Sequence, residues 1–212
     1  MQIRSIEAGP VATNCYLVYD EVHKEGVLID APMESLHLML PYILDNRIEL
    51  NAIFLTHSHW DHTIDAPAFK RETGAMIYIH KNDKYRLTNP MEYTSIPLPF
   101  SIDAFSPDFY YKHGDVFTVS GITLEIRHTP GHTEGGVCIV EHANRIVFTG
   151  DTLFNQGVGR VDLPGGDWQT LIHSINEQIF TLPDNYIVQC GHGPGTSIAN
   201  EKRFNPFLRN NY

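Results

Sequence analysis

Four side chains of the kinds that bind metal ions lie within six residues of one another. The segment Thr-His-Ser-His-Trp-Asp-His (residues 56–62) directly follows an apolar run that fits a buried strand. Alternate residues after a strand project to one side, so His57 and His59 can converge on one ion, while Asp61 and His62 begin a helix and can face a second. Burying so many polar groups is costly without a cation. The segment therefore predicts a metal site and not a solvated turn.

Three further ligand-type side chains each follow a strand-like run in a turn that contains glycine. They are His132 in Thr-Pro-Gly-His-Thr-Glu-Gly-Gly, Asp151 in Phe-Thr-Gly-Asp-Thr-Leu-Phe and His192 in Cys-Gly-His-Gly-Pro-Gly-Thr. Glycine lets the backbone turn sharply and approach an ion closely. One such turn alone is typical of ordinary loops. Together with the first segment, the three turns predict one site whose imidazole and carboxylate ligands suit Zn and also Fe or Mn.

The elements that must position these residues alternate between strands and helices. Short apolar runs bounded by turn residues predict strands at residues 14–19, 26–29, 52–56, 76–79, 115–119, 123–127, 136–141, 145–148 and 186–189. Apolar residues at helical spacing predict helices from residue 35 onward and at 61–73, 168–180 and 201–209. Four prolines within residues 88–108 predict a loop there, which is a candidate substrate flap or, as the equal alternative, a passive surface loop. Strands and helices in both halves suggest two packed sheets with helices outside.

Length, composition and charge narrow the class of protein. With 212 residues and 42% hydrophobic composition, the chain is predicted to form a single domain over residues 1–212. A net charge of −10 disfavours nucleic acid and anionic membranes as partners, because both would be repelled on average. Neither a leader-like start nor a run long enough to cross a bilayer is visible, so we expect a cytoplasmic protein. The three cysteines are scattered and form no CxxC pair, which argues against a disulfide framework.

The motifs HSHWDH, TPGHTEGG, FTGDTLF and GHGPGT together resemble the motif series of the metallo-beta-lactamase superfamily, specifically its glyoxalase II-like hydrolases, over about residues 10–210. The resemblance implies an α+β fold, a four-layer αββα sandwich of two mixed sheets flanked by helices, with metals at one sheet edge. It also implies two metal positions and a bridging ligand. The first metal would be held by His57, His59 and His132, the second by Asp61, His62 and His192, and Asp151 would bridge both.

The same resemblance implies a dinuclear metal-dependent hydrolase that cleaves a small thioester or ester by attack of a metal-bridging hydroxide. The expected cofactors are two divalent metal ions, zinc foremost, with iron or manganese as alternatives. Asp61 is hypothesised to orient the hydroxide. A thiolate has a pKa of about 8.5 and can leave without a general acid, so no Ser-His-Asp set is needed. An aspartate at position 151 disfavours cleavage of β-lactam antibiotics.

The residues after Asp151 bear on the substrate, which we expect to be a small molecule. Arg160 resembles the basic residue that contacts the glutathione carboxylate in glyoxalase II, and a loop arginine paired with Asp162 or Asp167 is the equal alternative. Asp162 and Pro194 stand where those enzymes carry tyrosines, and the chain ends soon after the expected sandwich. These departures leave the hydrolytic centre intact and put recognition of glutathione in doubt. The sequence gives no expectation of the oligomeric state.

Three other functions fit parts of the pattern. A mononuclear iron persulfide dioxygenase would use only His57, His132 and Asp151, and the presence of all seven ligands favours the hydrolase instead. A lactonase or phosphodiesterase could use the same site. A metal-bound module without catalysis would be supported by a site plugged with side chains and lacking an open metal position.

Overall fold

Two six-stranded sheets form the centre of the structure, which is a computed structural model that describes residues 1–94, 97–119 and 121–208. In the first sheet the strands lie in chain order: β1 (Gln2–Ala8), β2 (Thr13–Tyr19), β3 (Glu25–Ile29), β4 (Glu49–Phe54), β5 (Met76–His80) and β6 (Phe109–Tyr111). Strands β1 to β3 pair antiparallel, and the pairs from β3 to β6 are parallel. The first sheet is therefore mixed, as expected.

The second sheet is also mixed. Its spatial order is β14 (Thr196–Ser197), β13 (Ile187–Cys190), β10 (Ile146–Gly150), β9 (Val137–Glu141), β8 (Ile122–His128) and β7 (Val116–Val119). Strands β10 and β13 run parallel, and the other neighbours run antiparallel. A separate two-stranded hairpin, β11 (Leu153–Phe154) with β12 (Gly157–Val158), follows β10 directly.

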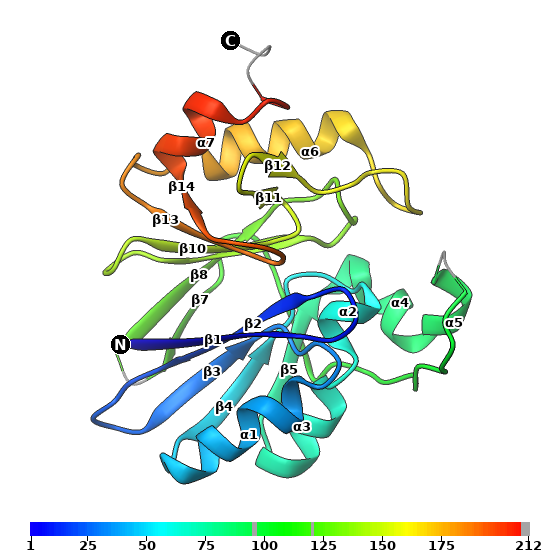
Figure 1. Cartoon of the computed structure of the whole chain (residues 1–212), viewed down its shortest axis with the longest axis vertical. Coiled ribbons are helices and arrows are strands. Elements are labelled where there is room, and N and C mark those ends of the chain that lie inside the picture. Colours follow the sequence, from blue (N-terminus) through cyan, green and yellow to red (C-terminus); the bar gives the residue numbers. More distant parts are fainter. Residues whose placement is uncertain (95–96, 120, 209–212) are drawn as a thin grey trace.

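Helices cover the outer faces of both sheets, which gives the predicted four layers (Figure 1). Helices α1 (Ser35–Asp45) and α3 (Ala66–Thr73) cover the first sheet, and α6 (Trp168–Ser174), continued by the π-helical turn η2 (Ile175–Ile179), and α7 (Ile198–Phe204) cover the second. Shorter helical segments lie at one end of the sheets: α2 (Trp60–Thr63), η1 (Lys81–Asp83), α4 (Lys84–Thr88) and α5 (Pro90–Tyr93). The α+β, αββα prediction is confirmed.

Three apolar clusters hold these layers together. Alternate residues of facing strands fill the space between the sheets, including Tyr16, Phe54 and Phe148, which are at most 4% exposed. The opposite faces of the same strands pack against the helices, with Met39 and Phe69 on the first sheet and Leu171 on the second. Strands buried on both faces explain why so many of them read as continuous apolar runs.

Several predicted boundaries differ from the observed ones. The helix predicted at 61–73 is two helices, α2 and α3, because Pro67 lacks the N–H that would bond to the turn before it. The prediction of a loop throughout 88–108 is wrong for residue 88, which ends α4, and for residues 90–93, since Pro90 occupies the first position of α5, where a proline is well tolerated. Residues 95–96 of that loop and residue 209 of the last predicted helix lie outside the described residues. The last helix begins earlier than predicted, at Ile198, where the Ser197 side chain accepts from the Asn200 N–H.

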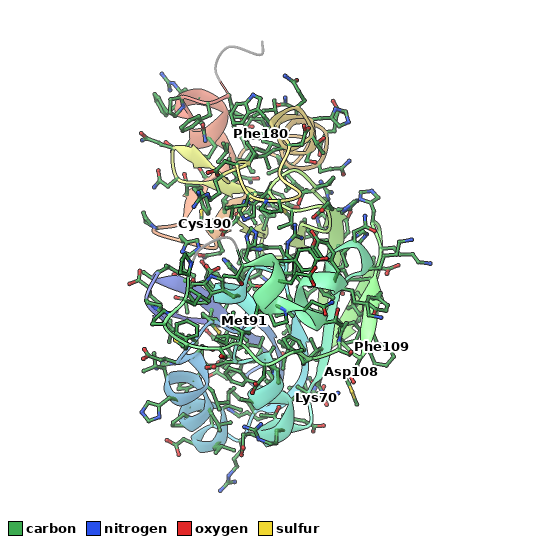
Figure 2. All side chains as sticks on the ribbon, turned by 90° about the vertical axis from the view of Figure 1, so that its right-hand side faces the viewer. Lys70, Met91, Asp108, Phe109, Phe180 and Cys190 are labelled. Atoms are coloured by element: carbon green, nitrogen blue, oxygen red, sulfur yellow. The ribbon has the colours of Figure 1, made fainter. Side chains whose placement is uncertain are left out.

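Contacts at the far end of the 88–108 segment attach it to the first sheet. The carboxylate of Asp108 forms an ion pair with Lys70 of α3 and accepts a hydrogen bond from the Ile77 N–H at 2.9 Å. Figure 2 shows Lys70 and Asp108 close together, with Phe109 beside them. Across the described residues, every helix is too short or too polar to cross a membrane.

Candidate metal centre

All seven predicted ligands lie at one end of the two sheets. Four of them stand between β4 and the end of α2, His132 lies in the turn between β8 and β9, Asp151 follows β10 directly, and His192 comes two residues after β13. Their ligand atoms form three groups, each within 4.8 Å: His57, His59 and His132; His57, His62 and Asp151; Asp61, His62 and His192. The structure thus brings together residues up to 135 positions apart, from 57 to 192.

Asp151 lies between the two outer groups. Its Oδ2 is 3.5 Å from His132 Nε2 on one side and 3.5 Å from His192 Nε2 on the other, and its Oδ1 is 3.2 Å from His62 Nε2. This placement agrees with the bridging position that the motifs imply. The ion that each residue holds stays a prediction.

The outer ring nitrogens of four histidines are held by oxygen atoms of the surrounding chain. The pairs are His57 Nδ1 with Thr56 Oγ1 (3.1 Å), His62 Nδ1 with Asp30 Oδ2 (2.8 Å), His132 Nδ1 with the Arg160 carbonyl (2.7 Å) and His192 Nδ1 with the Val11 carbonyl (3.1 Å). Carbonyl and carboxylate oxygens only accept, and the Thr56 hydroxyl gives its own proton to Asp30 Oδ2, so we assign the ring proton to Nδ1. Each Nε2 then directs a lone pair toward the centre, the arrangement typical of metal-binding histidines.

The central nitrogens are so close that they fit a cation between them. His59 Nδ1 is 2.9 Å from His132 Nε2, and His62 Nε2 is 3.3 Å from His192 Nε2. Ring nitrogens approach each other this closely only when a proton or another cation lies between them. Among the described residues, His57 Nε2 and Asp151 Oδ1 are buried without a hydrogen-bond partner. Buried polar atoms without a partner are costly, so the geometry and the donor set both fit divalent metal ions.

The electrostatics of the centre point the same way. Burial lowers the pKa of His57 well below its usual range and that of His59 to about 3, so both rings are neutral and able to bind a metal. Burial alone would raise the pKa of Asp151, but His62 and His192 outweigh it and hold that pKa well below its usual range. The carboxylates in turn raise the pKa of His192 to about 10 against the effect of burial. The cluster therefore attracts positive charge, which bound cations can supply.

The comparison with protein families decides the assignment of the fold. The model of the metallo-beta-lactamase superfamily matches residues 8–192, which include all seven ligands. The chain belongs to the metallo-beta-lactamase superfamily. It is similar to the hydroxyacylglutathione hydrolase GloC of Haemophilus influenzae, with 38% identity over 211 residues that cover 98% of each protein.

Solved structures agree with this assignment. The chain is similar to the crystal structure of the BLEG-1 B3 metallo-beta-lactamase, with a TM-score of 0.90, 33% identity and coverage of 98% of this chain and 99% of that one. It is also similar to ETHE1 from Myxococcus xanthus (TM-score 0.81, 30% identity, coverage 97% and 84%) and to TTHA1623 in a di-iron-bound form (TM-score 0.78, 32% identity, coverage 97% and 100%).

Asp30 supports this superfamily centre from outside and was missed by the sequence analysis. It is 2% exposed and accepts hydrogen bonds from Thr56 N (2.7 Å), Thr56 Oγ1 (2.8 Å) and His62 Nδ1 (2.8 Å). Its backbone is left-handed, with φ of 58°, a conformation that aspartate tolerates better than most residues. An acidic residue directly after the predicted strand 26–29 was the available signal. Asp30 thus fixes both the end of β4 and the orientation of the His62 ring.

Two more supporting residues were missed because their partners are distant in the sequence. Thr13 is fully buried, donates to Asp61 Oδ2 at 3.1 Å and pairs with His192 in a β-bridge. Asp83 is also fully buried and accepts from Ser58 N (2.9 Å), Thr133 Oγ1 (2.9 Å) and Gly135 N (2.6 Å), which joins the segments around His59 and His132. Both residues hold metal-binding segments in place without facing the centre.

A glycine beside Asp151 shows how closely the backbone approaches the ligands. A Cβ atom added at Gly191 would lie 2.2 Å from Asp151 Oδ1 and 2.8 Å from His62 Cε1. These distances are far below van der Waals contact, so any side chain at this position would displace two ligands. The sequence predicted that glycine here lets the backbone approach an ion. In the structure, Gly191 lets the backbone approach the ligands Asp151 and His62.

The centre opens into a cavity of about 440 Å³. Five of the seven ligands line it: His59, Asp61, His132, Asp151 and His192. Side chains of the 88–108 segment, among them Tyr93 and Phe105, form part of its wall, and the role of the segment as a flap stays a prediction. Arg160 also lines the cavity, and it is paired with Asp162, so the alternative role considered for this arginine is present in the structure. The site is open and not plugged by side chains, which removes the support expected for a module without catalysis.

Proposed function

We propose that this protein is a metal-dependent hydrolase that cleaves small thioesters or esters with two divalent metal ions. The observation that carries the proposal is the cluster of seven side chains that attracts cations and lies at the bottom of an open cavity. Membership of the metallo-beta-lactamase superfamily and the 38% identity to a hydroxyacylglutathione hydrolase support it.

The three groups of ligand atoms indicate which residues would hold the ions. His57, His59 and His132 would bind one ion, Asp61, His62 and His192 the other, and Asp151 would contribute to both. When bound, two divalent ions lower the pKa of water toward neutrality and polarise the substrate carbonyl. Zinc is the ion we propose, and the di-iron form of TTHA1623 makes iron the first alternative.

Asp61 is proposed to orient the attacking water. Burial would raise the pKa of its carboxyl, but His62 and His192 outweigh burial and keep that pKa below its usual value, so the group is a hydrogen-bond acceptor at neutral pH. Thr13 donates to one of its oxygens, which fixes the carboxylate where it lines the cavity. Asp61→Asn is expected to reduce turnover per bound metal, and unchanged turnover with the metals retained would contradict this role.

The presence of a complete second group argues for the hydrolase over an iron dioxygenase. A mononuclear enzyme would leave Asp61 and His192 without a function, although both have ligand atoms within 4.8 Å of the other members of their group. Oxygen uptake distinguishes the two, since only a dioxygenase consumes oxygen. The similarity to a B3 metallo-beta-lactamase adds a β-lactam to the substrates that need testing.

The decisive experiment combines metal analysis of the purified protein with a substrate panel. The panel contains thioesters that include S-lactoylglutathione, a lactone, a phosphodiester and a β-lactam, and oxygen is monitored throughout. We expect two metal ions per chain, thioester turnover that a chelator abolishes and no oxygen uptake. One iron per chain with oxygen uptake would establish the dioxygenase, and turnover of another substrate alone would reassign the hydrolase. Inert protein without metal would overturn the proposal.

A further inference from the structure

Away from the ligands, the cavity is lined mainly by apolar side chains. One side carries residues of α4, α5 and the segment before β6, and the other carries the β11–β12 hairpin and the residues after it. The apolar members include Trp60, Leu87, Tyr93, Phe105, Phe154 and Val158. A cavity of about 440 Å³ with this composition is suited to a small molecule with an apolar group.

Two cationic side chains, Arg86 and Arg160, are among the lining residues, and the charge of Arg86 is already neutralised. Arg86 is 4% exposed, and its Nη2 lies 2.8 Å from Glu134 Oε2 while its Nη1 lies 3.4 Å from Asp83 Oδ1. Its Nη2 also donates to the Pro164 carbonyl. With these partners Arg86 joins α4 to two loops of the other half of the molecule, and it has little capacity left for an anionic substrate.

The second cationic side chain, Arg160, is held by Asp162 in a two-point pair. Arg160 Nε donates to Oδ1 and Nη2 donates to Oδ2, both at 2.7 Å, and the side chains are 58% and 65% exposed. The pairing with Arg160 lowers the pKa of Asp162 to about 2, so the carboxylate is charged throughout the working range. An anionic substrate that approached Arg160 would have to displace this carboxylate or lie beside it.

From the apolar lining and the Arg160–Asp162 pair, we propose that the enzyme selects thioesters of apolar acyl groups with uncharged thiols, and that Asp162 is a specificity residue that disfavours anionic substrates. The inference rests on the proposed hydrolase function and names its substrate class. The net charge of −10 acts in the same direction, because it repels anions approaching from solution.

The first test varies the acyl group and the thiol independently. Acetyl, butyryl and hexanoyl thioesters are prepared with N-acetylcysteamine, which is uncharged, and with glutathione, which is anionic. We expect kcat/KM to rise by up to about fourfold for each added methylene and to be higher for the uncharged thiol. A flat or falling dependence on acyl length, or a preference for glutathione, would overturn the inference.

The second test changes the pair at Arg160. Asp162→Asn frees the guanidinium from its anionic partner, so we expect the ratio of kcat/KM for the glutathione thioester over the uncharged one to rise by about fivefold, in the range of a surface ion pair. Asp184→Asn is the matched control: it also removes one exposed carboxylate from an ion pair, and its partner Lys202, at 2.8 Å, does not line the cavity as Arg160 does. The control is expected to leave the ratio unchanged. An unchanged ratio in Asp162→Asn would overturn the assignment.

Binding of inert analogues separates failure of this inference from failure of the hydrolase proposal. Ethyl and hexyl thioethers of the same two thiols cannot be hydrolysed, and their binding can be followed by fluorescence because Trp60 lines the cavity. We expect the hexyl thioether of N-acetylcysteamine to bind tightest. Thioesters that are not turned over, with this order of binding retained, would refute the hydrolase function alone. Thioesters that are turned over, with the order lost, would refute the substrate class alone.

Discussion

The cavity has two regions that are built in opposite ways: a floor made of the seven-ligand cluster, five of whose members line the cavity, and a wall made of its lining residues between 87 and 105. In the floor, outer ring nitrogens are fixed by hydrogen bonds such as that from His62 to Asp30, and the ligand sets come from both sheets. In the wall, side chains such as Leu87 and Phe105 are held by packing and by few polar contacts, for example the Phe105 N–H with the Leu87 carbonyl at 3.0 Å. The difference implies that the floor decides whether the reaction occurs and the wall decides which substrate undergoes it.

The strongest way to break this comparison is to remove the ligand shared by both halves of the floor. Asp151→Asn replaces a carboxylate that lies within 3.5 Å of His62, His132 and His192 by a neutral amide. We expect kcat to fall by more than about 100-fold, since loss of supporting residues alone costs 10- to 100-fold, and the metal content to fall with it. Steady-state kinetics with metal analysis measures both. If Asp151→Asn kept full metal content and turnover, the floor would not be the reaction centre.

A residue that supports the floor from outside should give the next largest effect. In Asp30→Asn the amide nitrogen would face the donors Thr56 Oγ1 and His62 Nδ1, so one of these hydrogen bonds must be lost. We expect metal affinity to fall by about 10- to 100-fold, measured by competition with a chromogenic chelator. Asp65→Asn is the control, because Asp65 also accepts a backbone hydrogen bond, from Leu36 at 2.9 Å, and lies outside the ligand set. Equal losses in both variants would indicate general destabilisation instead of loss of His62 orientation.

A substitution in the wall should change substrate binding more than the chemical step. Phe105→Ala removes part of the apolar lining without touching a ligand, so we expect KM for an apolar thioester to rise by about 3- to 10-fold with little change in kcat. Phe109→Ala is the control, because Phe109 of β6 is 50% exposed and does not line the cavity. A fall in kcat with unchanged KM would show that the wall contributes to the reaction itself.

The floor was predictable from the sequence because each ligand lies at the end of an apolar strand, in a short motif of distinctive residue types. His57 to His62 are neighbours in the chain, and the turns around His132, Asp151 and His192 repeat the same strand-to-turn pattern. The two-sheet fold was predicted from the apolar strand segments that precede these ligands. Strands such as β1 and β6 were missed. Most residues of β1 are polar or exposed, and β6 has only three residues, so neither strand gives a clear apolar signal.

The wall and the supporting residues were not predictable for physical reasons. Thr13 and Asp83 act through partners 48 and 50 residues away in the chain, at Asp61 and Thr133. The wall combines prolines, which favour a loop in sequence terms, with short helices that depend on tertiary packing for their stability. The sequence also left open whether Arg160 pairs with Asp162 or with Asp167, because that choice depends on three-dimensional geometry.

The smallest effect is expected outside both regions, at His80 on the end of β5. His80 is 6% exposed and stacks on His128 with ring centroids 4.1 Å apart, and burial followed by the proximity of His128 lowers its pKa to about 4. An unfolded histidine has a pKa of about 6.5, so between these values the unfolded chain binds more protons and stability falls as pH falls. We expect His80→Phe, which keeps the ring, to recover about 1 kcal/mol of the loss between pH 7 and pH 5, measured by urea unfolding. His37→Gln on the exposed face of α1 is the control. If His80→Phe kept the full pH dependence of the original chain, the buried imidazole would not be the group whose protonation lowers the stability.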